Sequence, residues 1–225
     1  MDKRLERILP RVQKPARYVG GEYNEVQKDK RDVDVRFAFC FPDTYEIGMS
    51  NLGFRILYGV LNEMPGVWCE RAFAPWTDME AQMRAAGVPL YALESGDPVG
   101  GFDIIGFSVG YEMAYTAMLN MLELSGVPLR SAQRPSLAPL VVAGGTAMYN
   151  PEPVLIALYR RAKGEGWDKP RFLRAAAGIG GVYVPSLYEI SYNLDGTVSA
   201  ITPQEGAPER VYKRAVSDMD RSRFP

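Results

Sequence analysis

The chain has 225 residues, of which 47% are hydrophobic and 24% are charged, with a formal net charge of -1. This composition excludes a disordered or fibrous protein and allows one main domain with a small appendage. Because the basic residues are scattered and the charge is near zero, we expect no broad nucleic-acid-binding or anionic-membrane-binding surface.

No segment has the pattern of a membrane span or a secretory signal. The most apolar runs, residues 103–113 and 137–147, are interrupted by Gly, Ser or Glu and are shorter than the roughly 20 residues that a membrane helix needs. The first seven residues mix both charges and lack the apolar stretch of a signal peptide. We therefore expect a cytoplasmic protein without a transmembrane helix.

The chain contains two cysteines, Cys40 and Cys69, and no histidine. Both cysteines lie in apolar, strand-like settings, which favours buried thiols in a reducing compartment. Two cysteines without histidine cannot form an ordinary zinc site or a four-thiolate iron–sulfur cluster. The absence of histidine also removes Ser-His and Cys-His catalysis.

The first elements are an N-terminal arm and a buried strand. Residues 3–8 predict a short charged helix that Pro10 ends, and a turn-rich stretch follows around Gly20 and Gly21. Residues 33–42 are β-formers that become continuously apolar, typical of a strand buried on both faces of a parallel sheet. After Pro42, apolar residues at helical spacing predict a helix from about Ser50 to Asn62.

Further strand and helix signals alternate along the chain. Strands are expected at residues 67–73, 103–109 and 140–145. Thr77 and Glu80 form a capping-box pattern that predicts the start of a helix, and Gly87 is placed to end that helix. Met113, Met118 and Met121 recur at helical spacing after the third strand, and we interpret them as core residues.

Successive strand–helix units predict an α/β fold: a Rossmann-like, flavodoxin-like parallel sheet with helices on both faces. Beyond it, residues 155–163 and 171–177 predict helices. The β runs 181–192 and 197–201, joined by Asp195-Gly196, predict a hairpin. We therefore expect an arm at residues 1–32, the Rossmann-like domain at 33–180, and the hairpin with a linker at 181–225.

Three loops follow predicted strands, at residues 42–48, 108–112 and 144–147. The carboxyl ends of parallel strands meet at one edge, where glycines and free N–H groups favour ligand binding. Ordinary βα turns have similar residues, so both interpretations stay open. The residues expected to bind a cofactor are Asp43, Thr44, Gly48, Met49, Ser108, Val109, Gly110, Tyr111, Gly144, Gly145 and Thr146.

The loops contain neither a G-x-G-x-x-G nor a Walker motif, so a nicotinamide or nucleoside triphosphate site has no motif support. The acids nearest this edge are Asp43, Glu46 and Glu112. They are candidates for a base or a cation site, but solvated loop carboxylates and helix caps are the interpretation that we favour. We assign no catalytic residue and no metal site.

The order of these motifs resembles a known family. Residues 41–53 (Phe-Pro-Asp-Thr-Tyr-Glu-Ile-Gly-Met-Ser-Asn-Leu-Gly), residues 105–108 (Ile-Gly-Phe-Ser), and residues 143–145 with 150–153 (Asn-Pro-Glu-Pro) carry the resemblance. They resemble the N-terminal B12-binding-type domain of radical S-adenosylmethionine (SAM) proteins, in a little-characterised branch of B12-binding domain/radical SAM domain fusions. Residues 185–197 and 212–216 are similar to the connector before the family's catalytic barrel.

The chain departs from the family pattern in two places. The Cys-x-x-x-Cys-x-x-Cys triplet that binds the family's [4Fe-4S] cluster is missing, so SAM and the cluster are expected only in a barrel beyond residue 225. At residues 153–155 the family normally has a further strand and an acidic, glycine-containing loop, whereas a helix is predicted here at once. Either the protein lacks that strand or a segment is missing from the sequence.

The resemblance implies an accessory domain whose partner is its own radical SAM barrel, and whose three loops would bind cobalamin. Many cobalamin modules use Asp-x-His-x-x-Gly, but residues 43–48 contain no histidine. Cobalamin would therefore bind without a histidine ligand from the protein. The alternatives are a non-catalytic structural or partner-binding module without a ligand, and, with least support, a free-standing enzyme using Asp43 or Glu112.

Overall fold

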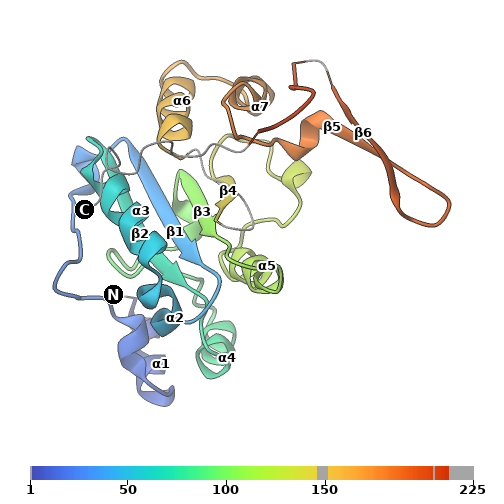
Figure 1. The fold of residues 1–225 in the computed structure, drawn as a ribbon. Coiled ribbons are helices and arrows are strands. Elements are labelled where there is room, and N and C mark those ends of the chain that lie inside the picture. Colours follow the sequence, from blue (N-terminus) through green and yellow to red (C-terminus); the bar gives the residue numbers. More distant parts are fainter. Residues whose placement is uncertain (1, 146–151, 205, 213–225) are drawn as a thin grey trace. The chain divides into compact units, whose positions relative to one another are not determined.

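The computed structural model describes residues 2–145, 152–204 and 206–212. The described residues divide into two compact units, residues 2–145 and residues 152–204 with 206–212. The first unit contains a parallel sheet with its helices, and the second contains two helices and a hairpin (Figure 1). No helix in the described part of the chain is long and apolar enough to cross a membrane.

The sheet of the first unit has four parallel strands in the order β2-β1-β3-β4. These strands are β1 (Val35–Phe41), β2 (Val67–Phe73), β3 (Ile104–Ser108) and β4 (Leu140–Gly144). All residues of β2 and all but Arg36 in β1 are buried, which explains their long apolar runs. The chain adds β2 on one side of β1 and β3 on the other, so its direction of winding reverses between β1 and β3.

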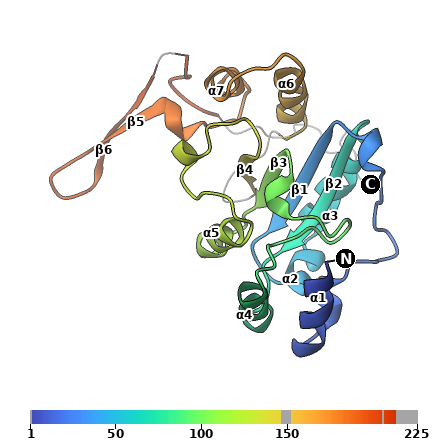
Figure 2. The same cartoon turned by 180° about the vertical axis from the view of Figure 1, so that it is seen from behind.

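Helices cover both faces of this sheet, as Figures 1 and 2 show from opposite sides. On one face, α3 (Leu52–Glu63) stacks Phe54 on Phe39 with 4.3 Å between ring centroids. On the other face, α1 (Lys3–Ile8), α4 (Thr77–Ala86) and α5 (Ala114–Leu124) contribute to one core cluster that includes Ala38 and Cys40. The predicted α/β class is therefore confirmed.

The helix expected from about Ser50 to Asn62 is confirmed as α3, which begins at Leu52. A short helix before it, α2 (Tyr45–Ser50), was not predicted and overlaps the expected loop, and the cap expected for α4 was wrong. Asn51 separates α2 from α3 because its side chain accepts a hydrogen bond from the Phe54 N–H and caps α3. Thr77 is the first residue of α4 and makes no cap, since Trp76 occupies the N-cap position, whereas Gly87 ends the helix as predicted.

The methionine prediction was correct in part. Met121 is fully buried, but Met113 is 83% exposed and precedes the first residue of α5. The prediction for Met113 was wrong because this residue precedes the helix, so helical spacing does not apply to it.

Side chains and the backbone near Leu93 form hydrogen bonds with the backbone groups on the outer edge of β2. The Asn62 amide both accepts from the Cys69 N–H and donates to the Cys69 carbonyl, at 3.0 Å each. Lys28 donates to the Val67 carbonyl at 2.6 Å. At Arg71, the N–H donates to the Glu94 carboxylate and the carbonyl accepts from the Leu93 N–H. These contacts keep an edge strand from pairing with another chain.

In the second unit, α6 (Glu152–Gly164) and α7 (Lys169–Ala177) pack together, with Tyr159 and Phe172 ring centroids 6.1 Å apart. An antiparallel hairpin, β5 (Tyr188–Tyr192) and β6 (Val198–Pro203), follows. Gly196 has the positive φ, 83°, that its turn requires. Both helices and the hairpin are confirmed, although β5 begins at Tyr188 and not at residue 181. Residues 213–225 of the predicted linker lie outside the described residues.

Candidate functional site

The loops after β1 and β3 meet at the carboxyl edge of the sheet. The Tyr111 hydroxyl donates a hydrogen bond to the Asp43 carboxylate at 3.2 Å, and this contact raises the pKa of Tyr111. Because the winding direction reverses between these two strands, the contact lies at the topological switch point. In open α/β sheets, ligands bind at this point.

The loop after β4 joins the same edge. The Val109 N–H donates to the Gly144 carbonyl at 2.6 Å. Gly145 has a φ of 119°, and a Cβ at this position would collide with the Val109 backbone. Gly145 must therefore be glycine for the two loops to approach this closely. The end of β2 is joined too, since the Ala74 N–H donates to the Asp43 carbonyl at 3.0 Å.

The loop after β3 is the most open part of this edge. Ser108 is partly buried at the end of β3, whereas Tyr111 is 48% exposed. Gly110 is exposed, and a Cβ built on it would meet no atom within 4 Å. The Tyr111 ring and the open space beside Gly110 are thus accessible to a ligand here. Thr146, which we also expected in this site, lies outside the described residues.

Three other predicted residues have contacts away from Tyr111. Thr44 is the N-cap residue of α2. Gly48 is buried where a side chain would collide with the Phe73 ring. The Met49 sulfur accepts a hydrogen bond from Arg71 at 3.3 Å. These contacts give α2 a role in fixing the β1 loop on the sheet.

Of the two other acids at this edge, Glu46 contacts the N-terminal arm. Its carboxylate accepts from Arg17 at 2.8 Å, and this hydrogen bond lowers the pKa of Glu46. Lys14 lies 3.4 Å from the same carboxylate. Glu112 is exposed. The pairing of Glu46 makes it an anchor for the arm, so we assign it no role as a base.

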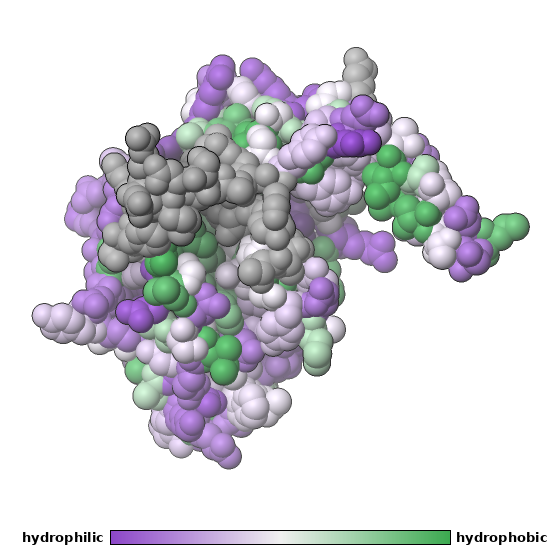
Figure 3. All heavy atoms as spheres, in the orientation of Figure 1, coloured by the Kyte–Doolittle hydropathy of each residue, from purple (hydrophilic) through white to green (hydrophobic). Residues whose placement is uncertain are grey.

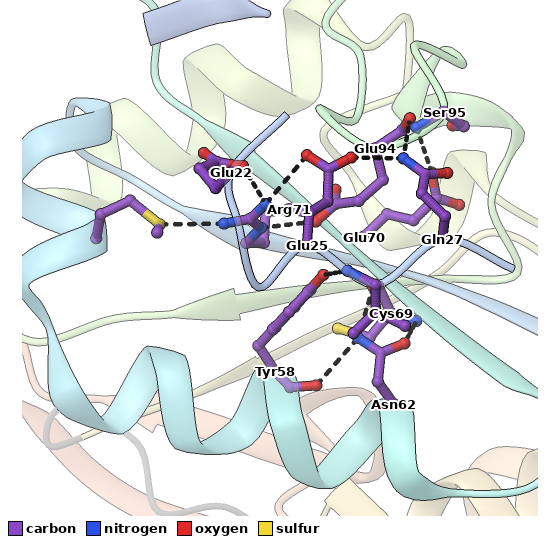
Figure 4. Close-up of polar contacts among 12 residues, drawn as sticks. Glu22, Glu25, Gln27, Tyr58, Asn62, Cys69, Glu70, Arg71, Glu94 and Ser95 are labelled. Atoms are coloured by element: carbon purple, nitrogen blue, oxygen red, sulfur yellow. Dashed lines mark hydrogen bonds and ion pairs between the residues drawn. The ribbon is translucent and has the colours of Figure 1, made fainter. Parts of the chain in front are cut away.

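A buried charge cluster around Arg71 of β2 was missed by the sequence analysis (Figure 4). Arg71 is 4% exposed and pairs with Glu94 at 2.6 Å, Glu22 at 2.7 Å and Glu25 at 3.6 Å. The Tyr58 ring lies 4.8 Å from the guanidinium carbon. Glu22 and Glu25 belong to the arm, so the cluster binds the arm to the sheet.

The cluster contains more acid than base. Burial raises the pKa of Glu94 to about 7, although Arg71 opposes the shift. Burial disfavours a charged Arg71, but Glu94 and Glu22 outweigh it and raise the pKa of the guanidinium. The available signal was a Glu-Arg dipeptide, Glu70-Arg71, inside an otherwise apolar strand. Such residues are almost never fully buried unless they are paired.

The cysteines do not fit an iron–sulfur cluster. Cys40 and Cys69 are fully buried, and burial raises the pKa of both thiols. The register pairs Cys69 with Phe37, three residues from Cys40, so the two side chains point to opposite faces of the sheet. Within the described residues, no group of three or more potential ligands could hold a metal.

The fold and its loop edge define a Rossmann-like α/β protein with a potential ligand site at the switch point. Residues 53–156 match the family described as radical SAM proteins, N-terminal. The match associates this region, from α3 to the start of α6, with the N-terminal parts of radical SAM proteins. No curated protein and no solved structure matches the chain.

Proposed function

We propose that this chain is an accessory domain of a radical SAM protein and that it binds cobalamin at the carboxyl edge of the sheet. The family match supports the association with radical SAM proteins. The observation that carries the site is the meeting of the loops at the switch point, through Asp43 with Tyr111 and Val109 with Gly144.

The groups at this edge suit a large, amide-rich ligand. The open space beside Gly110 gives a ligand room to approach. The partly buried Ser108 hydroxyl offers a hydrogen bond, and the half-exposed Tyr111 ring offers a flat apolar surface. Because the chain has no histidine, binding would depend on the corrin edge and the nucleotide tail. When bound, cobalamin supplies a methyl group carried on cobalt. The protein would position the cofactor for a separate SAM-cleaving domain.

Retention of cobalamin after desalting tests this proposal. The protein is incubated with hydroxocobalamin, desalted and examined for corrin absorbance, with about one corrin per chain expected. Gly110→Trp fills the open space and should weaken binding at least about tenfold, since it blocks close approach of the ligand.

Gly101→Trp is the matched control. Gly101 is also exposed with no atom near its Cβ position, but it precedes β3 and lies toward the opposite edge. This variant should retain the corrin. Absence of corrin bands on the unsubstituted protein, or equal loss in both variants, would contradict the proposed site.

A second candidate function is a non-catalytic module that binds a protein partner. The exposed apolar hairpin in the second unit favours it, because several large hydrophobic residues there are more than half exposed. Stable co-elution with a separately expressed radical SAM domain, without any corrin, would support this function over the first.

A further inference from the structure

The hairpin of β5 and β6 has one apolar face. Side chains alternate between the two faces of a strand, and directly paired residues share a face. Three cross-strand pairs therefore lie on the same side: Tyr188 with Pro203, Ile190 with Ile201, and Tyr192 with Val198. A bulge between Ser191 and Tyr192 shifts the register and keeps Val198 on this side.

The opposite face is polar. Glu189 pairs with Thr202, and Ser191 pairs with Ala200. Asp195 lies in the turn, where its carboxylate accepts from the Thr197 N–H. The acidic residue of the paired strands, Glu189, is thus absent from the apolar side.

The apolar face is exposed to solvent. Ile190 is 41% exposed, Val198 52%, Ile201 56% and Tyr192 63%. Figure 3 shows hydrophobic side chains gathered along this hairpin. A lone two-stranded hairpin is at best marginally stable in water, and it normally needs a further surface to cover its apolar face.

We propose that a second copy of this chain covers this face, with the two hairpins packed face to face about a two-fold axis. A two-fold interface uses the same patch on both copies, so an apolar patch is self-complementary. Because Glu189 points away and Asp195 lies in the turn, packing brings no carboxylates together. The result is a four-stranded sandwich with an apolar interior.

The size of the face suits such a dimer. Tyr183 extends the face, since its ring lies 4.9 Å from that of Tyr188, and the tip residue Leu194 is fully exposed. Aromatic side chains bury about 150–250 Å² each. Tyr183 is 47% and Tyr192 63% exposed, so only part of this area is still available. Together with the four aliphatic side chains it supplies a large share of the roughly 800 Å² that each partner contributes to a stable interface.

Sedimentation velocity over a range of concentrations tests the dimer. We expect the unsubstituted chain to dimerise, and Ile201→Glu to raise the dissociation constant at least about tenfold, because it places a charge in the apolar interior. Thr202→Glu is the matched control, with the same charge on the next residue of the same strand but on the outer face. It should dimerise like the unsubstituted chain.

Crosslinking gives a measurement that does not depend on a destabilising substitution. Both native cysteines are fully buried, so Ile201→Cys introduces the only accessible thiol. Packed sheets lie about 10 Å apart, a distance that a short bismaleimide can span. The reagent should join two Ile201→Cys chains but not two Thr202→Cys chains, because residue 202 lies on the outer face. A monomer at all concentrations, or equal crosslinking of both variants, would overturn the proposal whatever the outcome with hydroxocobalamin.

Discussion

At the residue scale, Arg71 is central to the arrangement of the first unit. Its guanidinium forms ion pairs with Glu22, Glu25 and Glu94. Glu22 and Glu25 come from the N-terminal arm. This cluster could not be predicted from the sequence, because Glu22 and Glu94 lie 49 and 23 residues from Arg71. Only the fold brings them together.

Glu94 should make stability depend on pH near neutrality. Its pKa in the folded protein is about 7, above the ordinary 4.5, so between these values the folded state holds a proton that the unfolded state has lost. Stability should therefore fall as the pH rises toward 7 and then level off. Between about pH 6 and pH 8 we expect a loss of about 1 kcal/mol in the free energy of unfolding.

Urea unfolding at several pH values would measure this slope. The chain has no histidine, so no imidazole titrates in this range. Glu94→Gln should remove most of the slope. Glu123→Gln, which removes a carboxylate whose pKa is lowered by its hydrogen bond with Arg84, is the control and should leave this slope unchanged. A slope that persists in Glu94→Gln would show that another group is responsible.

At the element scale, the strands and the hairpin could be predicted because their signals are local. Buried parallel strands have continuous apolar runs, and Asp195-Gly196 marks a tight turn. The short helix α2 could not be predicted, because its position depends on tertiary contacts. Tyr45 packs its ring 5.4 Å from that of Phe73, and Gly48 fits closely against the same ring.

The loops after β3 and β4 meet at the carboxyl edge of the sheet, and Gly145 allows their close contact. Gly145→Ala should destabilise the protein by about 1–3 kcal/mol, because the residue has a positive φ and its Cβ would collide with Val109. Gly110→Ala should change stability by less than about 0.5 kcal/mol, since no atom lies near its Cβ position. Thermal unfolding of both variants would compare them. Equal effects would contradict the close contact of the two loops.

At the scale of the whole molecule, the alternation of strands and helices was sufficient to predict the fold class. It was not sufficient to identify the ligand, since fold alone does not determine function. The family match begins at residue 53, so it supports the radical SAM association without the motif at residues 41–52, although it includes the motifs at 105–108, 143–145 and 150–153.

The central claim is that the carboxyl edge of the sheet is the ligand site. Hydrogen exchange with and without hydroxocobalamin tests it most directly. We predict slower exchange of backbone amides at residues 43–45, 108–112 and 144–145, with no change along β5 and β6. Protection confined to the hairpin, or no protection anywhere, would contradict the claim.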